Sequence, residues 1–214
     1  MHQFSDDLFK QLPIVGILRG YDKWTTLKIV TIYEQVGFRN IEITMNTPDV
    51  LSIIWSIVEQ FAGRLNIGVG TVLTKTQVDT VLSVGGQFIV SPIMDEGLIS
   101  YCKTKALPIF PGAYSPTEIF QAWMAGAKMV KVFPARNLGP SYIKDILAPL
   151  NDLALMPTGG VNEDNLPEYV DAGAQAFGMG GLLFDKQLIE RQDWAGLEKR
   201  LVAVREIWEK TQRS

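Results

Sequence analysis

The feature that most constrains the fold is a regular alternation of short apolar runs with segments of helical period, repeated eight times along the 214 residues. Strands are expected over 14–19, 40–44, 66–71, 87–91, 107–110, 129–134, 152–157 and 176–179. Helices are expected over 25–36, 48–61, 75–84, 95–104, 115–124, 142–147, 165–172 and 194–210. Strands that are apolar along their whole length are typical of a parallel sheet covered by helices. The pattern therefore predicts an α/β fold, a single-domain (β/α)8 TIM barrel over residues 1–214.

Glycines mark the helix ends in this pattern. Gly37, Gly85, Gly126 and Gly173 each lie shortly before an expected strand, as left-handed C-caps do. The alternative architecture is an open, doubly wound sheet, which often carries G-x-G-x-x-G after its first strand. This chain has Leu18-Arg19-Gly20-Tyr21 at that place, so the pattern favours the barrel.

Composition disfavours several classes of partner. The net charge is −3 and the isoelectric point about 5.3, with no basic patch of the kind that binds nucleic acid. The apolar runs are too short and too often interrupted to cross a membrane. The N-terminal stretch is acidic and amphipathic and lacks a signal-peptide pattern. A cytoplasmic protein with no nucleic-acid or membrane partner is therefore expected, and the single cysteine, Cys102, fits a reducing compartment.

The chain has one histidine, His2, near its N-terminus. Catalytic zinc sites draw heavily on histidine, and a Ser-His-Asp triad would have to use His2 from a terminal tail. Zinc chemistry and hydrolase triads are therefore disfavoured. A magnesium site built from carboxylates has no visible motif, so no metal and no cofactor are expected.

Lys131 is the strongest catalytic candidate. It lies in the apolar run Met129-Val130-Lys131-Val132-Phe133-Pro134, where burial would remove its hydration and lower its pKa. A neutral, positioned amine attacks carbonyl carbons and forms a Schiff base. The alternative is a strand-end lysine whose amine reaches water. Lys128 is the nearest competing lysine, but it precedes the strand and is expected at the opposite end of the barrel.

Glu42 is the expected partner for proton transfer. It lies between Ile41 and Ile43, so its side chain points into the barrel if the isoleucines contact the helices. A carboxylate buried there needs a cationic partner or a raised pKa, and both conditions suit acid–base catalysis near neutral pH. The alternative is a purely structural ion pair with Lys131, but buried ion pairs are costly and often do not stabilise a fold.

Other candidate residues follow the strands at their carboxyl ends, where barrel active sites form. Arg19 is suited to hold a carboxylate with two hydrogen bonds, the alternative being an ordinary ion pair at the rim. Thr71 is suited to hydrogen-bond the same group. The pairs Gly159-Gly160 and Gly180-Gly181 follow the last two strands. Their N–H groups are expected to bind phosphate, the alternative being plain turns.

A set of short motifs lies in order at strand ends along nearly the whole chain: Ile17-Leu18-Arg19, Ile41-Glu42-Ile43-Thr44, Gly70-Thr71-Val72, Val90-Ser91-Pro92, Pro111-Gly112, Lys131-Val132-Phe133-Pro134, Gly139-Pro140 and Pro157-Thr158-Gly159-Gly160-Val161-Asn162. With these motifs, the chain resembles the class I 2-keto-3-deoxy-6-phosphogluconate aldolases and their 6-phosphogalactonate relatives. Each motif is weak alone, whereas the ordered set is specific.

The resemblance implies roles for individual residues. Lys131 matches the Schiff-base lysine and Glu42 the general acid and base. The substrate-binding and phosphate-binding positions that it implies are Arg19, Thr71, Pro92, Thr158, Gly159, Gly160, Gly180 and Gly181. It also implies a metal-independent homotrimer that takes pyruvate and a 2-keto-3-deoxy sugar acid phosphate as small-molecule substrates.

Two positions depart from the family pattern. A serine is common in the family where this chain has Gly181, so a hydroxyl donor is lost while backbone donors remain. Either the affinity for phosphate is lower or the substrate is unphosphorylated. Asn46 looks more similar to the galactonate branch, because some gluconate enzymes carry Arg or Thr there, but one residue leaves the sugar epimer open.

The reaction that the resemblance implies is the reversible cleavage of 2-keto-3-deoxy-6-phosphogluconate, or of its galactonate epimer, to pyruvate and D-glyceraldehyde 3-phosphate. Three alternatives stay open. The first is an aldolase for 4-hydroxy-2-oxoglutarate or another unphosphorylated 2-keto acid. The second is a phosphosugar epimerase, which would need no imine at Lys131. The third is a non-catalytic sugar-phosphate-binding protein on an aldolase scaffold.

Overall fold

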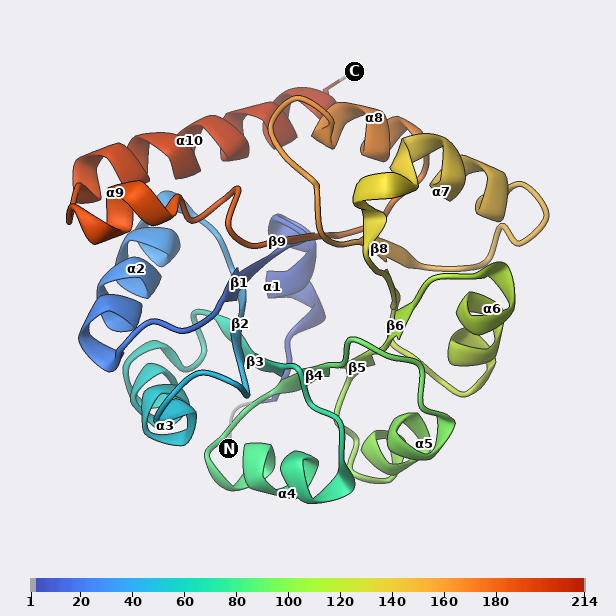
Figure 1. The fold of residues 1–214 in the computed structure, drawn as a ribbon, viewed down its shortest axis with the longest axis horizontal. Helices are drawn as coiled ribbons and strands as arrows, with labels where there is room; N and C mark the ends of the chain where they lie inside the picture. Colours follow the sequence, from blue (N-terminus) through green and yellow to red (C-terminus); the bar gives the residue numbers. More distant parts are fainter. Residues whose placement is uncertain (1–2, 214) are drawn as a thin grey trace.

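The computed structural model describes residues 3–213 as a parallel α/β fold (Figure 1). Its strands are β1 (Ile14–Leu18), β2 (Asn40–Thr44), β3 (Asn66–Gly70), β4 (Phe88–Val90), β5 (Ile109–Phe110), β6 (Gly112–Ala113), β7 (Val130–Val132), β8 (Leu155–Pro157) and β9 (Phe177–Met179). Its helices are α1 (Asp6–Gln11), α2 (Lys23–Val36), α3 (Val50–Phe61), α4 (Lys75–Ser83), α5 (Glu96–Thr104), α6 (Pro116–Met124), α7 (Gly139–Leu147), α8 (Leu166–Asp171), α9 (Lys186–Glu190) and α10 (Trp194–Thr211), with a 3-10 turn, η1, at Ala135–Asn137. The predicted alternation of strands and helices is confirmed, with small shifts at the ends of elements.

All of the strand pairs are parallel, and they form two sheets. One sheet has the order β5-β4-β3-β2-β1-β9 and the other has the order β6-β7-β8. Figure 1 shows the strands curling around a common centre with the helices outside them. Between β8 and β9, the Gln175 N–H donates to the Leu155 carbonyl (3.0 Å), and Thr158 forms a bridge with Gly178. The carboxyl ends of the strands therefore gather on one side of the molecule.

The fifth expected strand, 107–110, is observed as β5, and Pro111 separates β5 from a further short strand, β6, which the pattern does not predict. β5 pairs with β4, whereas β6 pairs with β7. Proline has no N–H to donate to a strand ladder, but the Pro111 carbonyl accepts a hydrogen bond from the Lys131 N–H at 2.9 Å. The division at Pro111 therefore passes the chain from one sheet to the other and fixes the backbone of Lys131.

The helix ends follow the expected capping chemistry. Ser115 and Glu118 form a reciprocal capping box at the start of α6. The four glycines predicted as C-caps, Gly37, Gly85, Gly126 and Gly173, have φ values of 110°, 84°, 103° and 93°. This left-handed region is open to glycine without steric cost. The prediction of these caps is confirmed, and each cap turns the chain directly towards the next strand.

The hydrophobic core has two parts that use opposite faces of the strands. The larger part packs the strands against the helices and includes Ile41, Ile43 and Val130. The smaller part includes Phe88 and Phe110 on the other strand face. The alternation of side chains along each strand separates the two parts, so polar residues on the inner face are held away from the helices.

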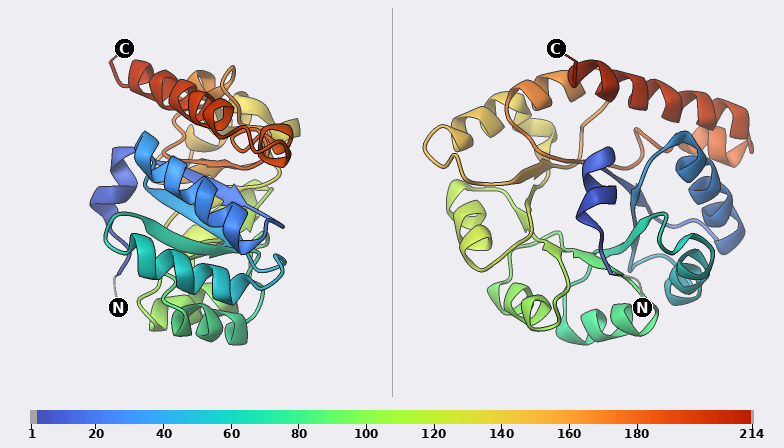
Figure 2. Two further views of the ribbon diagram at one scale, coloured as in Figure 1. Left: turned by 90° about the vertical axis from the view of Figure 1, so that its left-hand side faces the viewer. Right: turned by 180° about the vertical axis from the view of Figure 1, so that it is seen from behind.

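Helix α1 is a feature that the apolar pattern does not predict, because the helix is short and buries only Phe9. The Phe9 ring stacks on Phe110 with ring centroids 5.8 Å apart. Figure 2, seen from behind, shows α1 crossing the amino-terminal end of the strands. Phe4 adds an edge contact to Phe88, with centroids 5.7 Å apart. Aromatic side chains therefore close the amino-terminal end of the strands with apolar groups.

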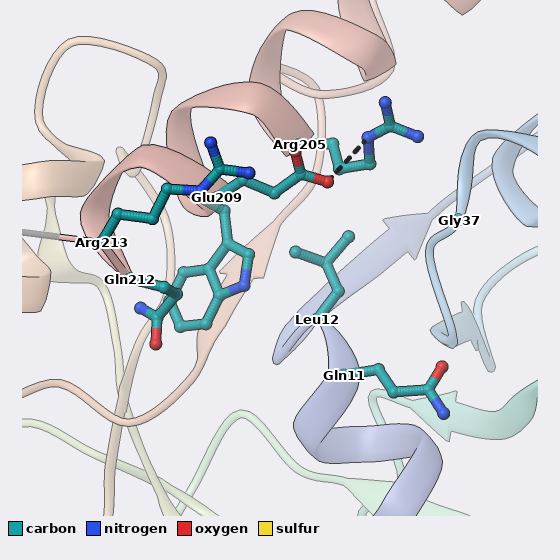
Figure 3. Close-up of a pocket in the computed structure, with 8 residues that line it drawn as sticks. Gln11, Leu12, Gly37, Arg205, Glu209, Gln212 and Arg213 are labelled. Atoms are coloured by element: carbon teal, nitrogen blue, oxygen red, sulfur yellow. Dashed lines mark ion pairs between the residues drawn. The ribbon is translucent and has the colours of Figure 1, made fainter.

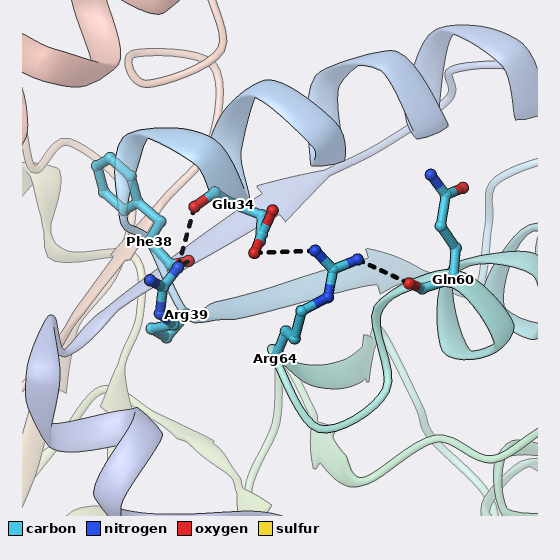
Figure 4. A network of polar contacts seen from close by, with 5 residues as sticks. All are labelled: Glu34, Phe38, Arg39, Gln60 and Arg64. Atoms are coloured by element: carbon cyan, nitrogen blue, oxygen red, sulfur yellow. Dashed lines mark hydrogen bonds and ion pairs between the residues drawn. The ribbon is translucent and has the colours of Figure 1, made fainter.

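A polar network holds two of the loops that lead into strands at this same end (Figure 4). Arg64 pairs with the Glu34 carboxylate at 3.2 Å and donates to the Gln60 carbonyl at 2.8 Å. Arg39 donates to the carbonyls of Glu34 and Phe38 at 3.0 and 2.9 Å. These contacts join the ends of α2 and α3 to the starts of β2 and β3, on the side opposite the carboxyl ends of the strands.

Within residues 3–213, no helix has the length and apolar character needed to span a membrane. Cys102 is a free, buried cysteine in α5. His2, the one histidine, lies outside the described residues.

Candidate active site

The carboxyl ends of β1, β2, β7, β8 and β9 meet around one cavity of about 410 Å³. It is lined by Ile17, Arg19, Glu42, Lys131, Phe133, Arg136, Thr158, Gly159, Gly160, Val161, Gly178, Gly180, Gly181 and Leu182. Eight of the ten residues singled out in the sequence contribute to this lining, and Thr71 and Pro92 do not. The cavity therefore collects the predicted amine, the predicted carboxylate and both glycine pairs.

Glu42 lies in the middle of β2 and is 2% exposed. Ile41 and Ile43 pack in the outer core, so the expected inward direction of the carboxylate is confirmed. Gly70 on the neighbouring strand makes this possible, because a Cβ there would lie 2.7 Å from the Glu42 Cδ. Within residues 3–213, Glu42 Oε2 is buried and has no hydrogen-bond partner. Burial raises the pKa of Glu42, while the charges of Lys131 and Arg19 oppose that shift.

Lys131 lies in the middle of β7 and is 6% exposed. Burial lowers its pKa; the Glu42 charge opposes this shift and the Arg19 charge adds to it. Its Nζ atom lies 4.7 Å from the centre of the Phe133 ring. Loss of hydration therefore favours the neutral amine, the form that attacks a carbonyl carbon.

Glu42 and Lys131 do not form a direct ion pair among the described residues, whose ion pairs all involve other side chains. Each still affects the pKa of the other through its charge. The purely structural ion pair considered from the sequence is therefore not formed. The two groups face one cavity as an amine and a carboxyl group that are both destabilised in their charged forms.

The two glycine loops present N–H groups while their carbonyls are held elsewhere. The Gly160 carbonyl accepts from Asn165 Nδ2 at 3.0 Å, and the Leu182 carbonyl accepts from Arg200 Nε at 2.7 Å. The Gly180 carbonyl accepts two backbone N–H groups of the following turn, at 2.8 and 2.9 Å. Within residues 3–213, the N–H groups of Gly160 and Gly181 donate no hydrogen bond. Unpaired N–H groups that line a cavity form a suitable site for an anion.

The residues at the base of these loops are tightly packed. Thr158 is 2% exposed, and its hydroxyl donates to the Met156 carbonyl at 3.3 Å. A Cβ at Gly178 would lie 2.8 Å from the Thr158 methyl group. Gly159 and Gly160 have φ values of 83° and 101°, which favour glycine. The loop geometry therefore depends on glycine at several positions.

Thr71 and Pro92 lie outside the cavity lining. Thr71 is half-buried directly after β3 and has a φ of 61°, a region that β-branched residues rarely adopt. Pro92 is half-buried, and its backbone leaves no room for a Cβ at Gly112 on β6. Both residues lie just beyond the carboxyl ends of their strands, as predicted, but neither lines the cavity.

Phe133 and Arg136 line the cavity and were not singled out in the sequence. For Phe133 a signal is present, because it lies two residues after Lys131 and alternation places it on the same strand face. Arg136 lies in η1, and its closeness to Gly160 depends on the approach of two loops that are far apart in the chain. No local pattern predicts that approach.

A second cavity of about 430 Å³ lies between α1 and α10 at the opposite end of the strands (Figure 3). Arg205 there pairs with Glu209 at 3.3 Å and donates to the Val36 carbonyl at 2.8 Å. This cavity is slightly larger than the one around Lys131, but it contains no buried amine or carboxylate. The cavity at the carboxyl ends is therefore distinguished by its buried ionisable side chains, Glu42 and Lys131, and not by its volume.

No group of three or more His, Cys, Asp or Glu side chains with metal-site geometry occurs in the part of the chain that the structure describes.

The cavity at the carboxyl ends of the parallel strands thus contains a buried amine and a buried carboxyl group. This arrangement is typical of α/β enzymes in which an amine attacks a carbonyl carbon and a neighbouring acid moves protons. Comparison with known proteins identifies the family. Residues 5–200 match the family model described as KDPG and KHG aldolase. The chain belongs to the KDPG and KHG aldolase family.

Curated relatives agree with this assignment. The chain is 39% identical over 173 residues to the probable 2-dehydro-3-deoxy-6-phosphogalactonate aldolase of Rhizobium meliloti, covering 80% of this chain and 82% of that protein. It is 32% identical over 190 residues to the 2-dehydro-3-deoxy-phosphogluconate aldolase of Pseudomonas aeruginosa, covering 88% of this chain and 84% of the relative.

Solved structures give the same result for the fold. A structure described as native KDPGal superposes with a TM-score of 0.88 at 32% identity, covering all (100%) of both chains. The KDPG aldolase of Legionella pneumophila, with pyruvate captured as a covalent carbinolamine intermediate, superposes with a TM-score of 0.85 at 25% identity, covering 92% of this chain and 96% of that chain. The resemblance to this aldolase family seen in the sequence is confirmed.

Proposed function

We propose that this protein is a class I aldolase that reversibly cleaves a 2-keto-3-deoxy-6-phospho sugar acid into pyruvate and D-glyceraldehyde 3-phosphate. The observation that carries the proposal is Lys131, an amine 6% exposed whose pKa is lowered by burial, in one cavity with Glu42. Family membership and relatives named as aldolases for the phosphogluconate and phosphogalactonate compounds support it.

In the proposed cleavage, the neutral Lys131 amine attacks the C2 ketone and forms a carbinolamine. Loss of water, with Glu42 as the proton carrier, gives a protonated imine. Glu42 then accepts the proton of the C4 hydroxyl, the C3–C4 bond breaks, and its electron pair moves into the imine to give an enamine. Protonation at C3 and hydrolysis release pyruvate and restore the amine. The raised pKa of Glu42 suits a group that must both accept and return a proton near neutral pH.

The two anionic ends of the substrate are assigned to different groups of the cavity lining. Arg19 follows β1 and is proposed to orient the pyruvyl carboxylate. The loops with Gly159, Gly160, Gly180 and Gly181 are proposed to bind the phosphate through their N–H groups. Thr158 directly follows β8 and lines the same cavity, where it is proposed to contact the substrate.

The substrate-binding roles of Thr71 and Pro92 stay predictions. Both residues lie outside the cavity lining. The left-handed backbone of Thr71 supports a functional constraint at this position, because such strain is found at active and binding sites.

A second candidate activity is the cleavage of 4-hydroxy-2-oxoglutarate or another unphosphorylated 2-keto acid. The observation that favours it is Gly181, which has no side-chain donor for a phosphate. The same Lys131 and Glu42 would serve both reactions. Rates with phosphorylated and unphosphorylated forms of one acceptor aldehyde separate the two activities.

The arrangement of the strands supports a closed (β/α)8 barrel in one domain over residues 1–214. The β5–β6 run joins the two sheets on one side, and contacts between β8 and β9 join them on the other. Exposed aromatic side chains such as Trp24 and Trp55, 58% and 54% exposed, support assembly into the expected homotrimer. Light scattering after size exclusion measures the assembly. The cytoplasmic location stays a prediction.

Borohydride trapping in the presence of pyruvate tests the proposed function directly. Reduction of a Schiff base would add the carbon skeleton of pyruvate to Lys131, and intact and peptide mass spectrometry would locate the added mass. An adduct on Lys131 leaves only the acceptor aldehyde to identify. If folded protein gives no adduct, the Schiff-base mechanism is wrong, and an epimerase or a binding protein becomes the leading interpretation.

A further inference from the structure

The geometry points to Arg136 as the charged ligand of the substrate phosphate and the residue that sets the preference for phosphorylated substrates. The inference rests on the proposed aldolase function. In this role η1 acts separately from the glycine loops. The guanidinium of Arg136 is suited to it by its position, by its charge and by the absence of a hydrogen-bond or ion-pair partner within residues 3–213.

The backbone of Arg136 is held against the loop that follows β8. The Ala135 N–H donates to the Thr158 carbonyl at 2.9 Å, and the Tyr169 hydroxyl donates to the Ala135 carbonyl at 3.4 Å. The approach to Gly160 is closer still, because a Cβ there would lie 2.8 Å from the Arg136 Cα and 2.9 Å from its Cβ. Glycine at position 160 therefore lets η1 and the glycine loop lie in contact.

The Arg136 side chain is exposed and lines the cavity. Within residues 3–213, its guanidinium forms no hydrogen bond and no ion pair. Arg200, which lies behind the neighbouring loop, differs because it is paired with Glu163 at 3.5 Å and with the Leu182 carbonyl at 2.7 Å. Arg136 thus lies beside Gly160 with its side-chain donors free for a ligand.

The charge of the lining also favours an anion at this place. Its cationic side chains are Arg19, Lys131 and Arg136, and its acidic side chain is Glu42. Glu42 and Lys131 lie together near the reacting centre, and Arg136 lies beside Gly160. A planar guanidinium matches a phosphate dianion with two parallel hydrogen bonds.

The loop after β9 offers no side-chain donor to a phosphate at Gly181, so a donor from elsewhere would add to binding. Gly181 contributes no side chain, and a Cβ built there would meet no atom within 4 Å. That loop therefore offers backbone N–H groups and open space. Arg136, beside the neighbouring loop at Gly160, supplies side-chain donors and a positive charge that the glycines themselves do not.

The test compares one reaction with two acceptors, the addition of pyruvate to D-glyceraldehyde 3-phosphate and to D-glyceraldehyde. Arg136→Ala should lower kcat/KM for the phosphorylated aldehyde roughly 10- to 100-fold, mainly through KM, as expected for loss of a charge-assisted hydrogen bond. The value for unphosphorylated glyceraldehyde should stay within about 2-fold. Arg136→Lys should be intermediate, because it keeps the charge and loses the planar fork.

Two further variants control the comparison. Arg64→Ala removes an arginine from the opposite end of the strands and should leave both acceptors unaffected. Gly181→Ser adds a hydroxyl into open space and should recover part of the activity lost in Arg136→Ala. Inorganic phosphate should inhibit the wild-type enzyme competitively, with an inhibition constant that rises in Arg136→Ala.

Borohydride trapping with pyruvate on every variant separates failure of the inference from failure of the proposed function. An adduct on Lys131 in all variants, together with equal losses or no loss for the two aldehydes, would overturn the role of Arg136 and leave the aldolase intact. Absence of an adduct in the wild-type protein would overturn the aldolase itself, and the role of Arg136 with it.

Discussion

Two lysines three residues apart, one just before β7 and one within it, have very different surroundings. Lys128 precedes β7 and pairs with Asp6 of α1 at 2.6 Å, with 38% of its side chain exposed. Lys131, three positions further on in the middle of β7, is 6% exposed and has its pKa lowered by burial. The expectation that Lys128 lies at the opposite end is confirmed by its contact with α1. Position in the chain, rather than residue type, therefore decides which amine is buried and has a lowered pKa.

The surroundings of the two lysines explain the difference. At the amino-terminal end, α1 crosses the strands (Figure 2), and the buried rings of Phe9, Phe88 and Phe110 belong to one apolar cluster. At the carboxyl end, glycines such as Gly70 and Gly178 leave room for polar side chains and for a ligand. One end is therefore filled by apolar packing and the other holds the candidate site, a division known from (β/α)8 barrels.

Replacing Lys131 with Ala should produce the largest effect on activity. Loss of the nucleophile should lower kcat by at least about four orders of magnitude and abolish the borohydride-trapped pyruvate adduct. Lys128→Ala, the matched control just before the same strand, should keep both, because it removes only a part-exposed ion pair with Asp6 and a contact with the Phe4 ring, both at the opposite end. Steady-state assays and intact mass spectrometry make the comparison. Substantial turnover in Lys131→Ala would contradict the assignment of the nucleophile.

Glu42→Gln should lower kcat by roughly 10²- to 10⁴-fold, the range of general acid–base catalysis. Because burial raises the pKa of Glu42 above its usual value of 4.5, the acid limb of the wild-type profile of kcat/KM should lie above that pH. The carboxylate acts as a base only when it is ionised, so activity should fall as the pH drops through this limb. The limb should disappear in Glu42→Gln. An unchanged acid limb would show that another group carries the proton.

Phe9→Ala should lower the free energy of unfolding by disrupting packing at the amino-terminal end, without changing the rate of catalysis. The Phe9 ring is 6% exposed and stacks on Phe110 at 5.8 Å, and truncating a buried phenylalanine removes about 3–5 kcal/mol of folding free energy. Urea denaturation measures this loss, while kcat of the folded variant should stay near the wild-type value. A large fall in kcat at temperatures where the variant is folded would show that the two ends are coupled.

Replacing both buried ionisable groups, in Lys131→Met with Glu42→Leu, should raise the free energy of unfolding by about 1–4 kcal/mol at neutral pH. Burial raises the pKa of Glu42 and lowers that of Lys131, so ionising either group near neutral pH costs the folded state free energy. For Glu42 this penalty grows as the pH rises through the unfolded-state pKa, and for Lys131 it grows as the pH falls below the unfolded-state pKa. Denaturation at several pH values checks the sign. A double variant less stable than wild type would mean that the pair stabilises the fold.

Arg64→Ala should have the smallest effect. Its ion pair with Glu34 spans 3.2 Å at the surface, and 52% of the arginine side chain is exposed (Figure 4). Exposed pairs of this kind contribute about 0–1 kcal/mol. Thermal unfolding should therefore shift little, and the rates with both acceptor aldehydes should stay unchanged. A marked loss of activity would show that the amino-terminal end also positions the site.

The sequence by itself determined most of the elements and much of the candidate site. Alternation along β2 placed Glu42 opposite Ile41 and Ile43, and the apolar run around Lys131 predicted its burial. Glycine C-caps such as Gly37 marked where helices end. These features follow from periods of two and 3.6 residues and from local backbone conformation, which neighbouring residues carry.

Only the tertiary structure decided which loops meet. It brought Arg136 against Gly160, left Thr71 and Pro92 outside the cavity, and set α1 across the far end of the strands. These relations depend on contacts between residues far apart in the chain, and on how the two sheets curl together at Pro111. A periodic pattern fixes the face on which a side chain lies, but the lining of a cavity depends on packing between segments that carry no shared local signal.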